Sequence, residues 1–394
     1  MFDRRTLFGA AATAAAFVGA LTGRKTAAAV PDGKDVQPRG AMGRYERLPT
    51  QNLDGVQDFL TGFRGWVNGD LSRAAMERAK AVLKANGIDP NAEMPIAEVV
   101  ALLEKDPILA TSTRTWLSTQ QMMWKTLQDE FHGNADKYLA EMEAADTKGP
   151  GTLELNPDMK IPDYAAHEIH IQPGGYVGDP FAGHIYLYGT ANFFTGRNYQ
   201  DEVQAEYARA LPLPKDGKVA RILDQGCSCG QTAVAIKERF PDAEVWGIDV
   251  GAPMVRYAHM RAVDLGVAVN FAQRLAEDSK FPDHHFDIVT NNIMFHEVPA
   301  AKAKEIVKES FRVLRPGGVF YPIDFYTGAP VPKNAYGLYR QWWDHRWNNE
   351  VWRLEYAALD FAGAMREAGF IVDEKGPPAG MGRSRNNIMG TKPA

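Results

Sequence analysis

The residues with the clearest chemical potential lie between positions 220 and 252. Asp224, Gly226 and Gly230 follow one apolar run, and Asp249 ends a second apolar run about twenty residues later. Glycines allow a tight turn and a close approach of ligand to backbone, because they have no Cβ. A carboxylate at the end of the next strand can accept hydrogen bonds from both hydroxyls of a ribose. The spacing therefore predicts a strand–turn–helix–strand unit that binds a nucleotide.

The composition of the turn indicates which kind of nucleotide it binds. Pyrophosphate sites usually carry Gly-x-Gly-x-x-Gly before a helix N-terminus. This turn instead reads Asp224-x-Gly226-x-Ser228-x-Gly230, with an acid and with neither Lys nor Arg. It suits a ligand that carries positive charge better than a polyphosphate. An NAD-dependent dehydrogenase is one alternative for this chain, and the glycine spacing argues against it.

The same pattern resembles the first motif of the class I S-adenosylmethionine (SAM)-dependent methyltransferases, Asp-x-Gly-x-Gly-x-Gly, with Ser228 in place of the middle glycine. Downstream, the segment from Arg312 to Gly318 (Arg-Val-Leu-Arg-Pro-Gly-Gly) is similar to the one before the fifth strand of quinone-type and other small-molecule methyltransferases. The resemblance spans about 170 residues after the turn and implies SAM as the cofactor. It also implies an α/β fold with a doubly wound, Rossmann-like, seven-stranded sheet whose final strand is antiparallel.

The resemblance further implies cofactor contacts at the ends of the core strands. In that family an acid after the third strand contacts the adenine amine. Leu275 fills the usual aspartate position here, which leaves Glu277, Asp278 or backbone amides for this contact. The expected cofactor-binding residues are Asp224, Gly226, Ser228, Gly230, Asp249, Val250, Met254, Glu277, Asp278 and Asn291.

The reaction implied by such a donor requires few catalytic groups. A sulfonium methyl group is already activated, so transfer depends on positioning and desolvation of an in-line nucleophile. An oxygen acceptor also needs a base, and His296, His170 and His345 are the candidates. The alternative for His296 is that it caps a turn or orients its neighbours. An activated carbon acceptor needs orientation alone.

Residues 161–200 combine glycines, tyrosines and three histidines, which predicts an irregular segment that forms a lid or a pocket wall. A metal site made by His167, His170 and His184 is one alternative. The spacing His-x-x-His in an extended stretch would place the first two rings on opposite faces. We therefore predict hydrogen-bonded packing for these histidines and no metal site.

A second aromatic group follows the fifth core strand, within residues 326–356. The carboxyl ends of the strands are where ligands bind in open α/β sheets, so this insertion is expected beside the methyl donor. The tryptophans of this insertion have two possible roles. They could pack between the two domains, or they could form an aromatic pocket for the methyl acceptor. The expected substrate contacts are Tyr176, Tyr326, Trp342 and Trp343.

The length of 394 residues suggests two folded parts. We predict a signal peptide at 1–29, a linker at 30–50, a helical N-terminal substrate or lid domain at 51–205 and a methyltransferase domain at 206–394. The patterns at 55–68, 72–86, 95–105 and 112–145 predict the helices of the N-terminal domain.

The first 29 residues resemble a twin-arginine export signal. Arg4 and Arg5 precede an Ala-rich stretch that is too short to span a membrane, and residues 27–29 offer a small-residue cleavage site. This export route moves folded, often cofactor-loaded proteins, so the predicted location is periplasmic or otherwise exported. The alternatives are a disordered N-terminus and a cytoplasmic location. Because SAM is made in the cytoplasm, an exported enzyme would lack a local supply.

Charge and cysteine content narrow the partners. Lys and Arg total 44 against 49 acidic residues, for a net charge of −5 with no basic block, which disfavours nucleic acid. Cys227 and Cys229 lie too close in sequence for an unstrained disulfide and are expected to be small buried residues. We therefore predict a SAM-dependent methyltransferase that modifies oxygen or carbon of a small molecule and has no stable membrane span, with the twin-arginine export machinery as a further partner. The alternative is an exported SAM-fold binding protein that lacks turnover.

Overall fold

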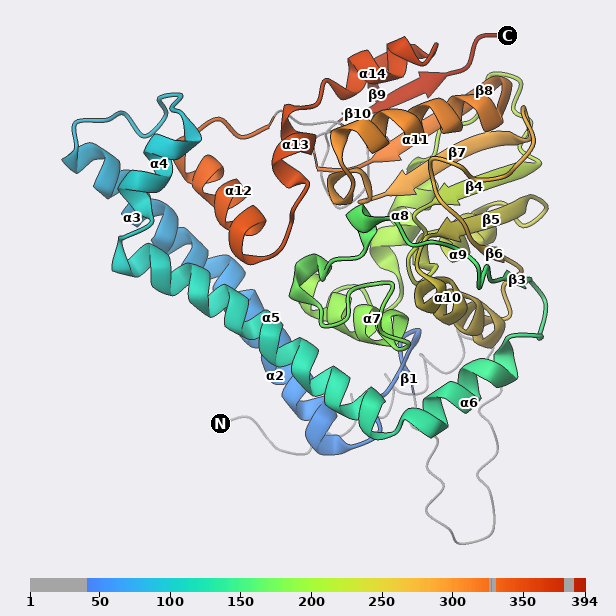
Figure 1. Ribbon diagram of the computed structural model, residues 1–394, viewed down its shortest axis with the longest axis horizontal. Coiled ribbons are helices and arrows are strands. Elements are labelled where there is room, and N and C mark those ends of the chain that lie inside the picture. The colour runs from blue at the N-terminus through green and yellow to red at the C-terminus, as the bar shows by residue number, and fades with distance from the viewer. Residues whose placement is uncertain (1–40, 326, 328–330, 379–385) are drawn as a thin grey trace, which may run out of the picture. The chain divides into compact units, whose positions relative to one another are not determined.

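The computed structural model describes residues 41–325, 327, 331–378 and 386–394 (Figure 1). Residues 41–394 form one compact unit, and the division predicted at 205/206 stays a prediction. The predicted signal peptide, residues 30–40 of the linker, and Tyr326 lie outside the described residues. Within the remainder of the predicted linker, two short strands, β1 (Ala41–Met42) and β2 (Tyr45–Glu46), pair antiparallel.

A single mixed sheet forms the centre of this unit, with strand order β3-β6-β5-β4-β7-β8-β10-β9. The strands from β3 to β8 pair in parallel, whereas β10 is antiparallel to both of its neighbours. The bounds are β3 (Leu153–Glu154), β4 (Arg221–Gln225), β5 (Glu244–Asp249), β6 (Asn270–Gln273), β7 (Phe286–Asn292), β8 (Leu314–Ile323), β9 (Ile371–Pro378) and β10 (Asn386–Thr391). The doubly wound α/β class and the antiparallel final strand are confirmed.

The predicted number of seven strands is wrong for the described chain, because β3 adds an eighth. This two-residue strand pairs with β6 in parallel, and the Phe271 amide donates a hydrogen bond to the Thr152 carbonyl at 2.8 Å. So short a strand has no period of its own, and it becomes a strand only because the edge of β6 offers unpaired backbone groups.

Helices cover both faces of the sheet, which explains why the central strands β4 and β7 are buried along almost their whole length. Ile222 packs into the cluster beneath α8, α9 and α10, whereas its neighbour Leu223 packs into the cluster beneath α11 and α14. The alternation follows from the period of two along a strand. The bounds are α8 (Glu202–Ala210), α9 (Gln231–Arg239), α10 (Ala252–Leu265), α11 (Ala300–Val313), α13 (Arg353–Ala358) and α14 (Phe361–Glu367).

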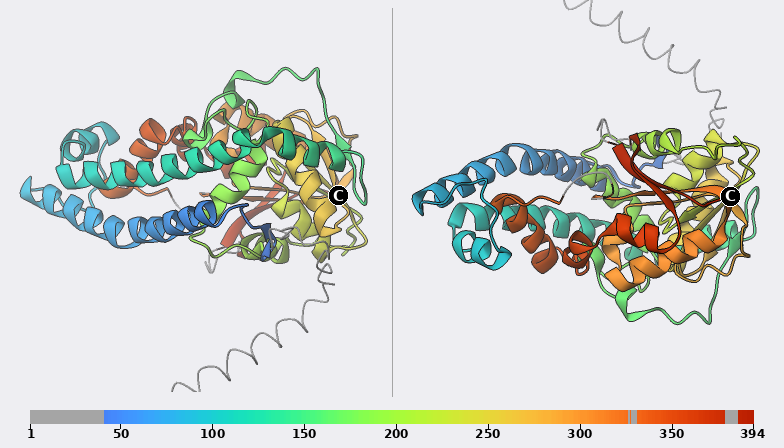
Figure 2. Two further views of the ribbon diagram at one scale, coloured as in Figure 1. Left: turned by 90° about the horizontal axis from the view of Figure 1, so that it is seen from below. Right: turned by 90° about the horizontal axis from the view of Figure 1, so that it is seen from above.

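The residues before the sheet form the helices that the sequence predicts. Their bounds are α2 (Gln51–Trp66), α3 (Ser72–Ala85), α4 (Ile96–Leu103), α5 (Pro107–Gly133) and α6 (Ala135–Ala145), with a short π-helix (Val67–Leu71) joining α2 to α3. Asp106 caps α5 by accepting hydrogen bonds from the amides of Ile108 and Leu109, and Pro107 occupies its first turn. The long helices α2 and α5 lie side by side in all views (Figures 1 and 2).

The aromatic insertion packs against these helices. Its helix α12 (Ala335–Trp347) contacts α3 and α4, and Trp343 lies edge-on to Trp116 with ring centroids 5.0 Å apart. Trp342 stacks on Tyr339 with a centroid distance of 5.7 Å. Packing between the N-terminal helices and the insertion is thus the interpretation that the structure favours for these two tryptophans.

The segment 161–200 differs from the prediction of irregular structure, because residues Ala182–Phe193 form helix α7. This helix is buried on most of its sides, so it lacks the alternation of polar and apolar faces that reveals a surface helix in a sequence. Its glycines allow close packing: a Cβ on Gly183 would lie 2.3 Å from Cβ of Tyr257, and one on Gly189 would lie 2.1 Å from the Trp124 ring.

Candidate active site

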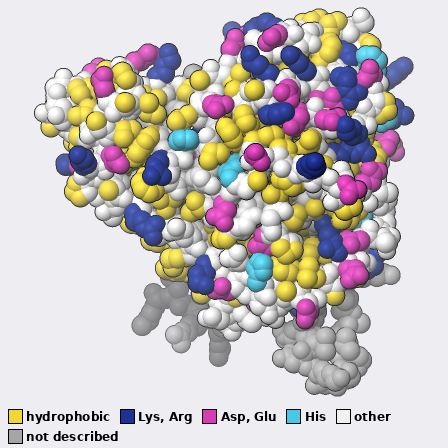
Figure 3. All heavy atoms as spheres, viewed as in Figure 1, with side chains coloured by type: hydrophobic (Ala, Val, Ile, Leu, Met, Phe, Trp, Pro, Cys, Tyr) yellow, Lys and Arg dark blue, Asp and Glu magenta, His cyan; other side chains and the backbone are white. Residues whose placement is uncertain are grey.

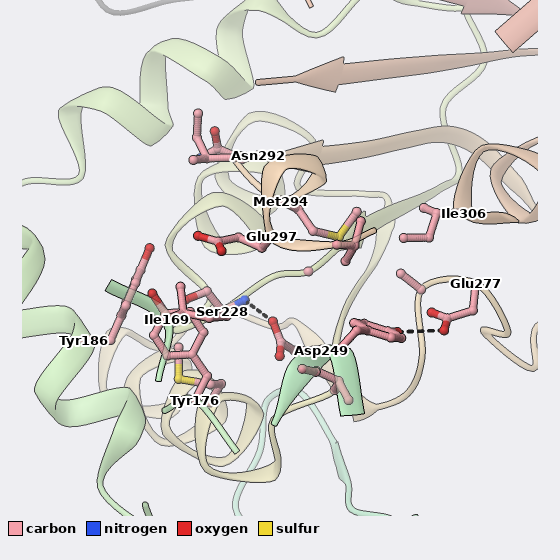
Figure 4. Close-up of a pocket in the computed structure, with 18 of the residues that line it drawn as sticks. Ile169, Tyr176, Tyr186, Ser228, Asp249, Glu277, Asn292, Met294, Glu297 and Ile306 are labelled. Carbon is pink, nitrogen blue, oxygen red and sulfur yellow. Dashed lines mark hydrogen bonds between the residues drawn. The ribbon is translucent and has the colours of Figure 1, made fainter. Parts of the chain in front are cut away.

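A cavity of about 860 Å³ opens at the carboxyl ends of β4, β5 and β7. Gly226 and Ser228 follow β4, Asp249 ends β5, and Asn292 ends β7. Figure 4 shows Asp249 and Ser228 at the cavity between Glu277 on one side and Tyr176 and Tyr186 on the other. This is the position at which open α/β sheets bind ligands.

The turn after β4 is shaped to leave this space open. Gly226 has a φ of +66°, and a Cβ there would lie 2.5 Å from Sδ of Met294. Ser228 also adopts a left-handed conformation, with φ of 51°, and its amide donates to the Asp249 carboxylate at 2.9 Å. Gly230 serves packing, since a Cβ on it would lie 2.8 Å from the side chains of Ala258 and Phe271.

Two cysteines flank Ser228 in this turn. Cys227 and Cys229 are both buried and free, as the sequence predicts.

Asp249 lies in the wall of the cavity with acceptor capacity to spare. One carboxylate oxygen accepts from the Ser228 amide and the other from the Gly251 amide, each at 2.9 Å. Each oxygen has a further lone pair, so two ribose hydroxyls can still donate to it. Burial raises the pKa of the Asp249 carboxyl. Val250 and Met254, both predicted cofactor contacts, also line the cavity.

The predicted adenine contact separates into two different environments. Glu277 lines the cavity, accepts a hydrogen bond from the Tyr164 hydroxyl at 2.7 Å, and keeps a buried oxygen, Oε2, without a hydrogen-bond partner. Asp278 is half exposed and pairs with Lys280. It is not among the described residues that line the cavity. An amine can therefore be bound by Glu277.

These features fit SAM. The carboxylate of Asp249 can hold the ribose, and the free oxygen of Glu277 can accept from the adenine amine. Gly226 lines the cavity without a side chain, so the amino-acid end of a ligand can approach its backbone. Asp224 and Asn291 are fully buried below the turn and are not among the described lining residues. Burial, with the nearby Asp249, raises the pKa of Asp224 well above its usual range.

A second cavity of about 1190 Å³ adjoins the first. The two share four lining residues, which are His170, Tyr186, Asn292 and Ile293. Aromatic side chains from the N-terminal helices, α7, α8 and the segment after β8 line the second cavity, together with two arginines: Trp116, Phe193, Phe194, Tyr207, Phe325, Arg340 and Arg353. An acceptor bound in this second cavity would therefore lie next to the first one.

Two of the three predicted catalytic histidines meet where the cavities join. His170 belongs to a short 3-10 helix (Ile169–Ile171), and His296 belongs to another (Phe295–Glu297) that follows β7. Glu297 and Glu350 lie beside both histidines, and all four side chains hold ligand-type atoms within 4.8 Å of one another. His345 lies elsewhere, with its Nδ1 3.2 Å from the Glu350 carbonyl, and it is not among the described residues that line either cavity.

His170 adopts a strained backbone conformation, with φ of 53° and ψ of 27°. Its carbonyl accepts hydrogen bonds from Gln120 Nε2 at 2.7 Å and from Trp124 Nε1 at 2.9 Å. Gln120 is itself held by the buried Arg64, which donates to its Oε1 at 2.9 Å. Helix α5 thus supports a left-handed conformation at His170. The segment is not extended here, so the prediction that the rings of His167 and His170 lie on opposite faces does not apply.

The electrostatics of this cluster follow from burial and pairing. Burial lowers the pKa of His296, but Asp324 and Glu297 outweigh it and raise the pKa well above its usual range. Burial likewise opposes the charge on His170, and the carboxylate of Glu350 still raises its pKa. Burial would raise the pKa of Glu350, but His170 lowers it to about 2. His170 and Glu350 therefore favour each other's charged forms.

The structure places the remaining predicted residues as follows. Tyr176 lines the first cavity, and its hydroxyl contacts Nδ1 of His170 at 2.9 Å. Trp342 and Trp343 belong to the helical packing described above and line neither of the two cavities as described. His184, in α7, lies against the rings of Tyr257 and Phe131, away from His170.

Sequence reasoning missed several residues of the site. Asn292 and Glu297 each directly follow a predicted residue in the chain, so their neighbours could have indicated them. Asp324 could have been suspected at the end of β8. Glu350 and Tyr164 carry no local signal, since they reach the site through the insertion and the pocket wall.

Comparison with known proteins agrees with this geometry. A methyltransferase domain family matches residues 222–318. A demethylmenaquinone methyltransferase from Thermus thermophilus is 38% identical over 130 residues, which are 33% of this chain and 57% of that protein. An uncharacterized methyltransferase from Synechocystis is 30% identical over 160 residues, covering 39% of this chain and 68% of that protein. A fatty-acid O-methyltransferase from Mycolicibacterium smegmatis is 30% identical over 131 residues, 33% of this chain and 46% of that protein.

The fold and the site define a Rossmann-like protein built to bind SAM. The chain belongs to the class I SAM-dependent methyltransferase family. This chain spans little more than half the length of the first of these relatives. The matched parts of that protein and of the fatty-acid O-methyltransferase each correspond to about a third of this chain.

Proposed function

We propose that this protein transfers a methyl group from SAM to oxygen or carbon of a small molecule that binds in the second cavity. The observation that carries the proposal is the junction itself. A cavity with Asp249 and Gly226 in its wall shares four lining residues with a larger cavity that is lined by both aromatic and polar side chains. A donor in the first cavity and an acceptor in the second can therefore approach each other without passing through solvent.

The lining of the second cavity favours an acceptor with an aromatic or otherwise flat apolar part and a polar end. Trp116, Phe193 and Phe325 offer ring faces. Arg340 and Arg353 lie 4.0 Å and 3.7 Å from the carboxylate of Asp344 in the same lining, so the polar part of the cavity holds charges of both signs. The activities for which two relatives are named, those of a demethylmenaquinone methyltransferase and a fatty-acid O-methyltransferase, are compatible with such acceptors. Phenols, quinols and small aromatic acids are thus the classes to test first.

Acidic and basic side chains lie intermixed on the face shown in Figure 3, which does not resemble a surface for nucleic acid. The formal net charge of −5 points the same way. Among the helices of the described chain, none combines the length and the apolar character that crossing a bilayer requires.

SAM supplies an electrophilic methyl group when it is bound. The residues of this chain then have three tasks: Asp249 and Glu277 hold the donor, the aromatic cavity orients the acceptor, and a group at the junction accepts a proton if the acceptor atom is a hydroxyl oxygen. His170 and His296 are the proposed groups for the proton, because both line the second cavity. Neighbouring carboxylates raise the pKa of both imidazoles, so each must first release its own proton, and transfer to a hydroxyl oxygen should increase with pH. His170, Tyr176 and Tyr186 help to close the first cavity against water.

Calorimetry with SAM, followed by a screen for transfer of a radiolabelled methyl group to phenols, quinones and small acids, tests the proposal. We expect SAM binding and label transfer to at least one aromatic acceptor. Binding without transfer to any acceptor would favour the alternative function, a SAM-fold binding protein without turnover. Absence of SAM binding would refute both.

We propose in addition that residues 1–29 direct twin-arginine export. The support is the sequence alone: two adjacent arginines, an Ala-rich stretch and a small-residue cleavage site. The double variant Arg4→Lys, Arg5→Lys should accumulate inside the cell, as measured by fractionation, while the unchanged chain reaches the periplasm. An identical location for both proteins would contradict this.

A further inference from the structure

We propose that His170, His296, Glu297 and Glu350 form a binding site for one divalent first-row transition-metal ion at the junction of the two cavities. This site extends beyond methyl transfer and stands on the geometry of the four side chains alone. Two imidazoles and two carboxylates are ligands typical of Zn²⁺, Mn²⁺ and Fe²⁺ in proteins.

The distances between the ligand atoms match the edges of a coordination sphere. Nε2 of His170 lies 2.7 Å from Oε1 of Glu350 and 3.4 Å from Oε1 of Glu297. Nε2 of His296 lies 3.2 Å from Oε1 of Glu297 and 3.9 Å from Oε2 of Glu350. For metal–ligand bonds of about 2.1 Å, neighbouring ligands are separated by about 3.4 Å in a tetrahedron and about 3.0 Å in an octahedron.

The second ring nitrogen of each histidine has a partner that orients it. Nδ1 of His296 donates to the carboxylate of Asp324, at 2.9 Å to Oδ1, and Nδ1 of His170 pairs with the Tyr176 hydroxyl at 2.9 Å. Both Nε2 atoms are therefore directed to the centre of the cluster. A carboxylate behind a ligating histidine fixes its tautomer and raises its basicity, as in many zinc sites.

Unused acceptor atoms point to a missing ligand. Glu350 is 3% exposed, and its Oε2 is buried without a hydrogen-bond partner, as is Oε2 of Glu297. One divalent cation could bind both of these oxygens together with the two imidazole nitrogens. Arg353 is a further neighbour of Glu350, with its Nη1 4.0 Å from Oε1.

The ligands come from three separate segments of the chain. His170 lies in the pocket wall, His296 and Glu297 follow β7, and Glu350 lies in the insertion between α12 and α13. An ion bound by all four would connect the insertion and the pocket wall to the sheet, so it should also stabilise the folded protein. The ion would border the second cavity, where an oxygen of an acceptor molecule could bind to it.

The test uses the full chain purified without added chelator. Elemental analysis should find close to one bound transition-metal ion per chain. After the ion has been removed by a chelator, addition of Zn²⁺, Mn²⁺ or anaerobic Fe²⁺ should raise the melting temperature, whereas Mg²⁺ should have a smaller effect because it prefers all-oxygen sites. With Co²⁺ as a probe, the unaltered protein should show visible ligand-field absorption of a nitrogen- and oxygen-ligated ion.

Isosteric variants locate the site. Glu350→Gln and His170→Asn should lose the ion, and Asp324→Asn should weaken its affinity roughly 10- to 100-fold. The matched control is His132→Asn, because His132 also pairs with a carboxylate, that of Asp179 at 2.9 Å, but lies outside the cluster. It should bind like the unaltered protein.

Three results would overturn the proposal: no bound ion before or after addition of these metals, no change in melting temperature, or equal binding by the cluster variants and the unaltered chain. Each readout is independent of methyl transfer. A protein that binds SAM but no metal would lack this site and keep its proposed function, whereas a metal-binding protein without transfer would refute only the function.

Discussion

Replacement of Asp249 by asparagine is the most direct test of the donor site. The carboxylate already accepts hydrogen bonds from the amides of Ser228 and Gly251, one on each oxygen. Its remaining lone pairs face the cavity, where they can accept from two ribose hydroxyls. Asparagine keeps one acceptor oxygen and replaces the other with an NH₂ donor, so it cannot serve all four donors.

The expected magnitude follows from the hydrogen bond that is lost. A hydrogen bond to a charged group contributes about 1.5–3 kcal/mol. Since each 1.4 kcal/mol corresponds to a factor of ten, Asp249→Asn should weaken SAM binding roughly 10- to 150-fold. The NH₂ group must also face one backbone amide, which should lower the free energy of unfolding by about 1–3 kcal/mol.

Titration calorimetry with SAM measures the first effect, and urea denaturation measures the second. Asp278→Asn is the matched control, because Asp278 is a half-exposed carboxylate near the cavity that pairs with Lys280. It should bind SAM like the unaltered protein. If Asp249→Asn bound SAM with unchanged affinity while folding normally, the assignment of the ribose to this carboxylate would be refuted.

Two further predictions concern the turn and the back of the sheet. Gly226→Ala should reduce both SAM affinity and stability, because the left-handed φ costs about 1–2 kcal/mol and the new Cβ would meet Met294. Calorimetry measures the SAM affinity and denaturation measures the stability. The control is Gly217→Ala, where φ is also left-handed at +68° but no atom lies near the new Cβ, so its stability loss should be smaller. Equal losses in the two variants would contradict a clash with Met294. The second prediction concerns Glu309, where burial would raise the pKa of the carboxyl but hydrogen bonds from Arg312 lower it. The ionised carboxylate therefore stabilises the folded protein above the unfolded-state pKa of about 4.3, and this stabilisation is lost as the pH falls through the folded-state pKa. Glu309→Gln should therefore be about 1–3 kcal/mol less stable at pH 7. In denaturant titrations its stability should approach that of the unaltered protein as the pH falls below the folded-state pKa of Glu309, and a difference that stays constant with pH would refute the ionic explanation.

The cofactor half of the site could be predicted from sequence because it is local. The turn from Asp224 to Gly230 and the acid at Asp249 belong to one strand–turn–helix–strand unit, whose spacing the backbone geometry dictates. The order of the core strands follows the same logic. The short strand β3 and the buried helix α7 escaped prediction, since the first depends on a neighbouring edge and the second lacks an exposed face.

The aromatic insertion shows how composition alone can mislead. Trp342 and Trp343 have the residue types of a binding pocket, but the surface of the N-terminal helices was available to cover them. The aromatic lining of the second cavity comes instead from residues such as Trp116 and Phe193, which lie far apart in the sequence. A binding pocket and a packed helix interface both bury aromatic surface, so only the arrangement of the helices in the folded protein distinguishes them.

The amino-acid sequence by itself determined the class of sheet, the donor-binding turn and the carboxylate that faces it, because these depend on neighbours within one supersecondary unit. Only the tertiary structure decided that His170, His296 and Glu350 share one centre. They lie on three segments separated by more than a hundred and by more than fifty residues, and helix α5, the sheet and the insertion must all pack before they meet. Such long-range packing leaves no periodic signal in the chain.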